Sequence, residues 1–125
     1  LGFVGGEDRL FFARLAQAGE TIVWSAEAIC RETVEPDRVN AGWLTRRMSR
    51  VGTSTAFIEK ELRSGVATSL VLCAKGLVWW GLGVLSILAA PFGRHLAVAS
   101  ARRRAYGTGL LRGVFGALDA EYARS

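Results

Sequence analysis

Two adjacent carboxylates near the start of the chain, Glu7 and Asp8, have the setting that best suits proton transfer. They follow Gly5 and Gly6, which allow the backbone a tight approach. Apolar residues then recur at helical spacing, which predicts a helix from about Glu7 to Ala18 with both acids in its first turn. A carboxylate at the end of a glycine-rich loop could take a proton from a bound hydroxyl.

The same two acids also have a purely structural interpretation. Carboxylates are favoured in the first turn of a helix because the helix dipole is positive there. Neighbouring residues on a helix point about 100° apart, so Glu7 and Asp8 would not act as a facing pair. We expect one to do chemistry while the other caps, orients or stays solvated.

Residues 19–34 predict an α/β arrangement. Gly19 is suited to end the first helix. The β-branched and aromatic runs Thr21–Trp24 and Ala28–Val34 predict strands, with a turn or bulge at residues 25–27. We therefore expect an α/β fragment followed by membrane-associated helices.

From Arg38 to Arg63 the pattern predicts an amphipathic helix, with a kink or break at the Gly52–Thr55 stretch. One side is apolar and another is rich in arginine. Such a helix suits a bilayer surface. A surface helix packed on its own domain fits the pattern equally well.

Residues 65–93 form a long apolar stretch whose only charge is Lys75. About 20 apolar residues suffice for a helix to cross a bilayer, so we expect a transmembrane or re-entrant helix, with a buried soluble helix pair as the alternative. Lys75 would be awkward at depth and would snorkel to the headgroups. The positive-inside rule does not choose the membrane topology, because the segments on both sides of this stretch are basic.

Residues 94–125 predict a basic, glycine-interrupted interfacial tail around Arg102, Arg103 and Arg104. The net charge of +5 lies entirely in the second half: residues 1–64 hold nine basic and nine acidic side chains, and residues 65–125 hold seven and two. Beside a long apolar stretch this excess favours a membrane with anionic lipids. Basic and aromatic residues are not interleaved for base stacking, so we expect no nucleic acid partner.

The Gly-Gly-Glu-Asp sequence, followed by two phenylalanines and Arg-Leu, resembles the acceptor-side "ED" motif of family 2 glycosyltransferases. The resemblance runs through about the first 55 residues, and beyond them it extends only to the arrangement of membrane-associated helices. It rests on Gly5–Leu15, Trp24, Ala28, Glu32, Pro36, Arg38, Trp43 and 46–50.

The resemblance implies a GT-A fold and transfer of a sugar, with inversion, from a nucleotide-sugar donor to a glycan, polysaccharide or lipid-linked hydroxyl. Asp8 would be the catalytic base. Residues 1–64 would be the C-terminal portion of the transferase domain in a longer protein, with an amphipathic interface helix. They would lie on the cytoplasmic face of the cell's inner membrane.

Processive members of the family carry a Gln-x-x-Arg-Trp motif whose Trp lines the acceptor path. Trp43 stands at the corresponding place, but the Gln is missing and Gly42 replaces the Arg. Trp43 is thus a candidate acceptor platform, or an anchor of the helix to the domain or the interface. The arginines that could balance the donor diphosphate are Arg38, Arg46, Arg47 and Arg50.

The resemblance also implies Mg²⁺ or Mn²⁺ held by an Asp-x-Asp motif, which this sequence lacks. We therefore expect the metal and donor ligands to lie outside these residues, and the piece alone to be inactive. The competing hypothesis is a non-enzymatic membrane-anchoring module that binds anionic lipids.

Overall fold

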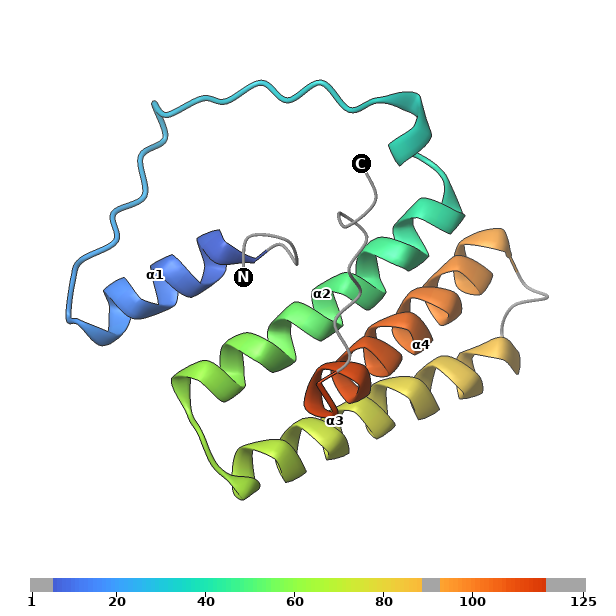
Figure 1. The fold of residues 1–125 in the computed structure, drawn as a ribbon. Helices are drawn as coiled ribbons and strands as arrows, with labels where there is room; N and C mark the ends of the chain where they lie inside the picture. The colour runs from blue at the N-terminus through green and yellow to red at the C-terminus, as the bar shows by residue number, and fades with distance from the viewer. Residues whose placement is uncertain (1–5, 89–92, 117–125) are drawn as a thin grey trace, which may run out of the picture.

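The computed structural model describes residues 6–88 and 93–116, which form four α-helices (Figure 1). Their bounds are Glu7–Gln17 for α1, Ala41–Leu62 for α2, Val66–Leu85 for α3 and Arg94–Val114 for α4. A 3₁₀ turn, η1 (Pro36–Arg38), precedes α2.

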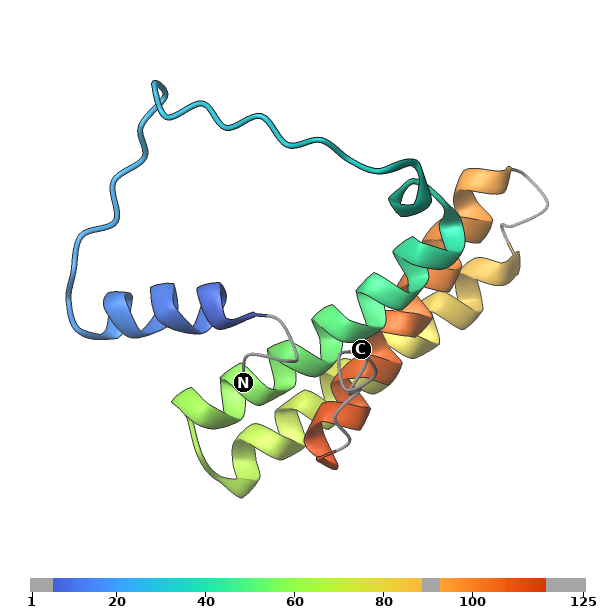
Figure 2. The ribbon, with the colours of Figure 1, turned by 45° about the horizontal axis from the view of Figure 1, so that its top comes forward.

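The last three helices lie side by side in one layer, with α4 in the middle (Figures 1 and 2). The chain passes from α2 to α3 and then returns between them as α4. As a result α4 runs parallel to α2 and antiparallel to α3. Helix α2 touches α3 only slightly, so α4 holds the layer together.

Small residues bring the backbones of α2 and α4 into close contact. A Cβ atom added to Gly113 of α4 would lie 2.6 Å from the Cβ of Ala56 and 2.7 Å from the carbonyl oxygen of Thr53 on α2. The buried Thr53 hydroxyl donates a hydrogen bond to the carbonyl of Gly109 at 3.1 Å. Such close approach is the packing that small residues at four-residue spacing permit.

Glycines bring α3 equally close to the other side of α4. A Cβ on Gly76 would lie 2.9 Å from the Cγ of Leu111, and one on Gly107 would lie 2.7 Å from the backbone nitrogen of Trp80. The buried Ser100 hydroxyl donates to the carbonyl of Gly83 at 2.7 Å. The two faces of α4 are therefore fixed by complementary backbones more than by large apolar side chains.

The α/β expectation is wrong: the structure is all helical, with no strand between residues 6 and 88 or between 93 and 116. Residues 20–35 instead run as a long irregular arc from α1 to η1 (Figure 2). A strand exists only where a neighbouring strand satisfies its backbone, and no other described segment lies beside this arc. Trp24, expected in a strand, is 90% exposed.

Of the kink or break expected at Gly52–Thr55, the break is wrong, since α2 is continuous through it, and the kink stays a prediction. Likewise α4 continues through Gly107, Gly109 and Gly113. Glycine weakens an isolated helix, but here these positions accept the neighbouring backbone, and the packing outweighs the propensity.

Candidate functional site

The structure confirms a helix at the paired carboxylates. Gly6 caps α1 with φ +102°, a left-handed conformation that glycine adopts without strain. Glu7 and Asp8 occupy the first turn, and an Asp8 carboxylate oxygen accepts the backbone N–H of Arg9 at 2.8 Å. Gly19, also left-handed, follows the C-cap as expected.

Helix α1 docks on the middle of α2 through a few contacts near its start. Gly6 approaches closely, since a Cβ there would lie 3.3 Å from the Cβ of Ser54. Leu10 is buried, and the Arg9 guanidinium donates to the Thr55 hydroxyl at 2.9 Å. These contacts bring the first turn of α1 to one face of α2.

An open pocket of about 600 Å³ lies where these helices meet. One helical face of α2 forms most of its wall, because residues 43, 47, 50, 51 and 54 recur at spacings of three and four. The lining residues are Gly6, Asp8, Arg9, Trp43, Arg47, Arg50, Val51, Ser54, Thr55 and Tyr106.

Charge and aromatic surface are combined in this pocket. Arg9, Arg47 and Arg50 line it, and among the described lining residues Asp8 is the single carboxylate. The Arg47 guanidinium carbon lies 5.0 Å from the centre of the Trp43 ring, a cation–π arrangement that fixes both groups. The pocket can therefore attract an anionic ligand and offer Asp8 as a proton acceptor.

The start of α2 positions Trp43. Asn40 caps the helix by accepting the backbone N–H of Trp43 at 2.7 Å, and its amide donates to the carbonyl of Asp37 at 2.8 Å. The cap and the preceding turn hold the Trp43 ring at the rim of the pocket.

The structure brings four of the candidate residues together and leaves three outside. Asp8, Trp43 and Arg47 line the pocket, as does Arg50. By contrast, the exposed residues Glu7 and Arg46 are absent from its lining, as is Arg38. The Nε of Arg38 instead lies 3.6 Å from the carboxylate of Glu35, the N-cap of η1.

Sequence reasoning missed Arg9 and Tyr106 as pocket residues. The helical spacing of Trp43, Arg47 and Arg50 was a usable signal, since it separates them from Arg46 on a different face. Tyr106 lies on α4, more than fifty residues along the chain from Arg50, and no local sequence pattern indicates that it joins the pocket.

The pocket does not fit the expected divalent cation. Among the lining residues that the structure describes, one carboxylate beside three arginines is a poor ligand set for Mg²⁺ or Mn²⁺, which prefer several oxygen ligands. In residues 6–88 and 93–116, no three His, Cys, Asp or Glu side chains gather as a metal site. The expected metal is thus assigned no residue here.

Within the described part of the chain, one helical stretch is long and apolar enough to cross a membrane, judged by length and composition. It is Val66–Leu88, 23 residues, few of which are buried. It lies at the edge of the layer, on the side of α4 away from the pocket's α2 wall.

Comparison with known proteins gives one partial relationship. The chain matches no protein-family model and no solved structure. Over 66 residues it is 38% identical to a protein named succinoglycan biosynthesis protein ExoM, from Rhizobium meliloti (strain 1021). The similarity covers 53% of this chain and 21% of that protein, so the chain spans about a fifth of its relative's length.

Proposed function

We propose that this chain takes part in polysaccharide biosynthesis as the acceptor-side part of an inverting, family 2 type glycosyltransferase. The observation that carries the proposal is the pocket that joins Asp8 to Trp43, Arg47 and Arg50. The name of the partial relative, a succinoglycan biosynthesis protein, supports a part in polysaccharide biosynthesis. The sugar would come from a nucleotide-sugar donor and pass to a hydroxyl of a glycan or lipid-linked acceptor.

In the proposed reaction, Asp8 removes the proton from the acceptor hydroxyl as its oxygen attacks the anomeric carbon of the donor sugar. The bond from that carbon to the nucleoside diphosphate breaks, and the diphosphate leaves with the bonding electron pair. Negative charge grows on the leaving group in the transition state, where Arg47 and Arg50 stabilise it. The Trp43 ring offers an apolar face for the acceptor sugar to stack on.

Replacing Asp8→Asn in the full-length protein tests this role. The amide keeps the size of the side chain but cannot accept the proton, so transfer should fall about 10²- to 10⁴-fold, the usual contribution of a general base. Donor binding, measured by calorimetry with the nucleotide-sugar, should change little.

Glu7→Gln is the matched control, because Glu7 has the same charge and lies in the same turn but does not line the pocket. It should retain transfer close to the unmodified level. Full activity of Asp8→Asn, or equal losses in both variants, would overturn the assignment.

A second function is favoured by a different observation, the exposed apolar face of α3 beside the arginines of α4. That edge of the layer would serve as a non-enzymatic membrane-anchoring module for anionic lipids. The two functions are compatible, since an anchor can hold the pocket near a membrane-bound acceptor.

A further inference from the structure

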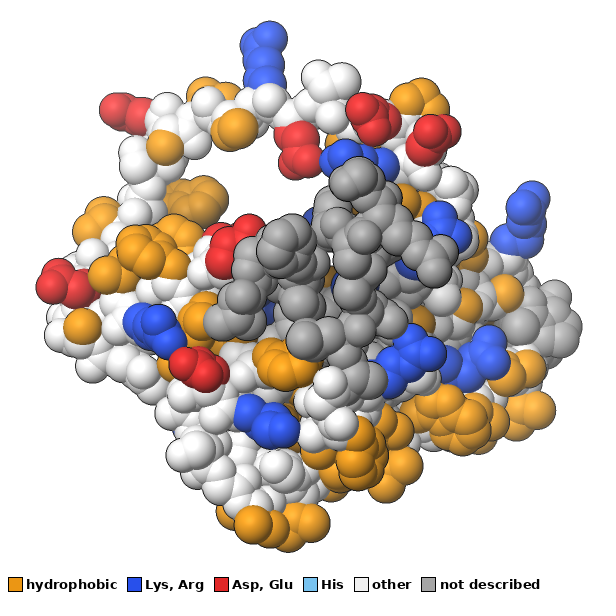
Figure 3. All heavy atoms as spheres, viewed as in Figure 1, with side chains coloured by type: hydrophobic (Ala, Val, Ile, Leu, Met, Phe, Trp, Pro, Cys, Tyr) orange, Lys and Arg blue, Asp and Glu red, His pale blue; other side chains and the backbone are white. Residues whose placement is uncertain are grey.

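The outer face of α3 is a continuous apolar stripe. Leu70, Leu77 and Leu85 are 65%, 61% and 64% exposed and recur at spacings of seven and eight, which places them on one side of the helix. Gly76 and Gly83, on the opposite side, are buried against α4. The stripe therefore points directly away from the layer, and in Figure 3 apolar side chains gather along the lower right edge, where α3 lies.

The neighbouring helix is basic along its whole length. Helix α4 carries five arginines and no acidic residue: Arg94, Arg102, Arg103, Arg104 and Arg112. In Figure 3 basic side chains lie immediately beside the apolar edge. The outer stripe of α3 is apolar, and the adjacent helix α4 is rich in arginine. This order matches a bilayer, in which acyl chains lie below anionic headgroups.

The packing of α4 on α3 argues against α3 crossing the bilayer in this arrangement. The two helices are antiparallel and in contact from Gly83, which meets the backbone of Arg104, to Gly76, which meets Leu111. A crossing α3 would draw α4 into the hydrocarbon beside it and distribute its arginines through the depth of the membrane. Arginine at that depth is costly, and separating the helices would expose the buried Ser100 hydrogen bond.

We propose that α3 lies in the plane of the bilayer interface, with its outer stripe toward the acyl chains and α4 above it at the level of anionic phospholipid headgroups. Packed helices are about 8–10 Å apart, and an interfacial helix is buried by about 5–10 Å. Helix α2, which packs on the far side of α4, then lies one helix spacing farther from the acyl chains. The Asp8 pocket and α1 lie with it in the water. This orientation does not depend on the glycosyl transfer proposed above.

Two features that fit a crossing helix poorly fit this orientation. Lys75 lines a hollow with Glu59 and Arg63, on the α2 side of α3, and so stays away from the acyl chains. Trp79 packs edge-on against Tyr106 of α4, with ring centres 5.6 Å apart. In this orientation Lys75 and Trp79 both lie at the depth of the membrane interface, where lysine and tryptophan are favoured.

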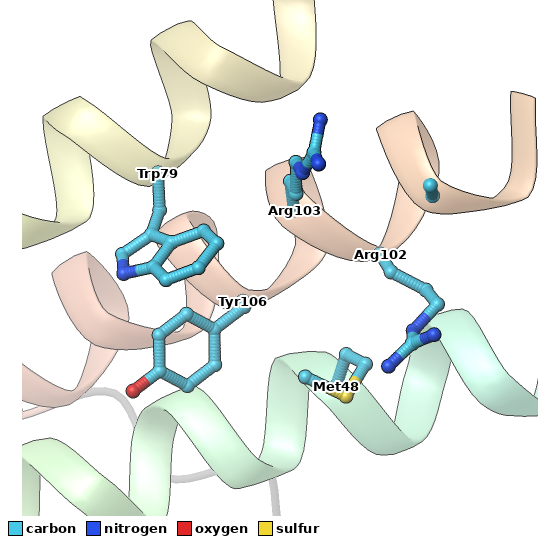
Figure 4. Close-up of a pocket in the computed structure, with 6 residues that line it drawn as sticks. Met48, Trp79, Arg102, Arg103 and Tyr106 are labelled. Atoms are coloured by element: carbon cyan, nitrogen blue, oxygen red, sulfur yellow. The ribbon is translucent and has the colours of Figure 1, made fainter. Parts of the chain in front are cut away.

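A second pocket, of about 410 Å³, lies at the level of α4. Arg102 and Arg103 line it, and Met48 of α2 and the aromatic pair Trp79 and Tyr106 complete its walls (Figure 4). Arg102 extends toward Met48, while Arg103 donates a hydrogen bond to the hydroxyl of Ser86, the C-cap of α3. At headgroup depth this pocket would take a lipid phosphate between the arginines and the rings.

Depth measurements on the full-length protein in vesicles test the orientation. A fluorophore is placed singly at Val66→Cys, Leu77→Cys or Leu88→Cys, with Cys30 and Cys73 replaced by Ser, and quenched by nitroxides at shallow or deep acyl positions. All three sites are exposed: Val66 and Leu77 lie on the outer face of α3, and Leu88 follows its C-terminal end. An in-plane helix gives the same shallow depth at all three.

Other depth patterns would overturn the proposal. A crossing helix would place Leu77 deep and both ends shallow, and a re-entrant helix would place Leu88 deeper than Val66. Fluorophores with no lipid contact at any of the three sites would exclude the membrane altogether.

Lipid charge is tested by vesicle co-sedimentation with phosphatidylcholine alone or mixed with phosphatidylglycerol. Arg102→Gln with Arg103→Gln should weaken binding to the anionic vesicles about tenfold, with little effect on neutral ones, and the difference should shrink with salt. The charge-matched control is Arg31→Gln with Arg38→Gln, which lie in the arc and η1, away from α3. Equal loss in both double variants would contradict a headgroup role for α4.

Discussion

The helix layer of this protein is closely packed, whereas its N-terminal arm is attached by few contacts. In the layer of α2, α4 and α3, backbones meet at glycines, and interhelical hydrogen bonds from Thr53 and Ser100 are buried. The arm consists of α1 and the arc of residues 20–35. It contacts the layer near the start of α1 and through the Arg14–Glu61 ion pair, and most of its apolar side chains are exposed.

This difference places the candidate site at the boundary between the two regions. Trp43, Arg47 and Arg50 come from the rigid layer, whereas Asp8 arrives on the lightly attached arm. The geometry between the proposed base and the cationic wall therefore depends on how firmly α1 docks. Changes in the layer should alter stability, and changes at the junction should alter activity.

The largest effect is expected from Gly109→Ala in the layer. The added methyl group would meet the backbone carbonyl of Ser49 and lie 3.0 Å from the backbone nitrogen of Thr53, and neither can move without shifting a helix. We expect a loss of about 3 kcal/mol or more in unfolding free energy, at the upper end for overpacking. Thermal unfolding followed by circular dichroism in nanodiscs measures it.

Gly81→Ala is the control for that change. It makes the same substitution within a helix of the same layer, but no atom lies within 4 Å of the new methyl group. It should be neutral or slightly stabilising, because alanine has the higher helix propensity. Similar losses at both positions would mean that the close helix contacts do not carry the stability of the layer.

A smaller effect is expected from Gly6→Ala at the junction. The change forces a left-handed φ on a residue with a Cβ, at about 1–2 kcal/mol, and crowds Ser54. The docked population of α1 should fall up to about tenfold, with faster hydrogen exchange in α1 and reduced transfer, while the layer unfolds at an unchanged temperature.

Gly19→Ala separates backbone strain from docking. Gly19 is also left-handed, but a Cβ there would meet nothing within 4 Å. The variant should loosen only the end of α1 and keep most of the transfer activity. A loss of activity as large as that of Gly6→Ala would show that the site responds to α1 stability and not to its contact with α2.

The sequence predicted the helices well where periodicity and caps agreed. The acids of α1 and Gly19 mark its ends, and Pro36 begins the turn that leads to α2. The prediction failed where a residue's role is set by a distant neighbour. Gly52, Gly107 and Gly109 suggest helix breaks in the sequence, but in the structure the backbone of a neighbouring helix packs against each of them. Thr21–Trp24 has strand propensity, but the structure places no strand beside it.

The same reason explains how much of the site was predictable. Asp8, Trp43 and Arg47 could be chosen from local sequence, and the structure brings them to one pocket. Arg9 is directed to the pocket wall by its contact with Thr55, and Tyr106 comes from α4. Such contacts depend on which helices pack against each other. Local sequence patterns do not show that packing.

The smallest effect is expected at the ion pair that links the arm to the layer. Arg14 and Glu61 are 2.9 Å apart, but their side chains are 59% and 52% exposed, so water and salt weaken their attraction. A double-mutant cycle with Arg14→Gln and Glu61→Gln should give a coupling below about 1 kcal/mol that disappears near 1 M salt. Docking of the arm would then rest on Gly6 and the buried Leu10, and not on this pair. A salt-resistant coupling above about 2 kcal/mol would reverse that order and make electrostatics the main attachment of the arm.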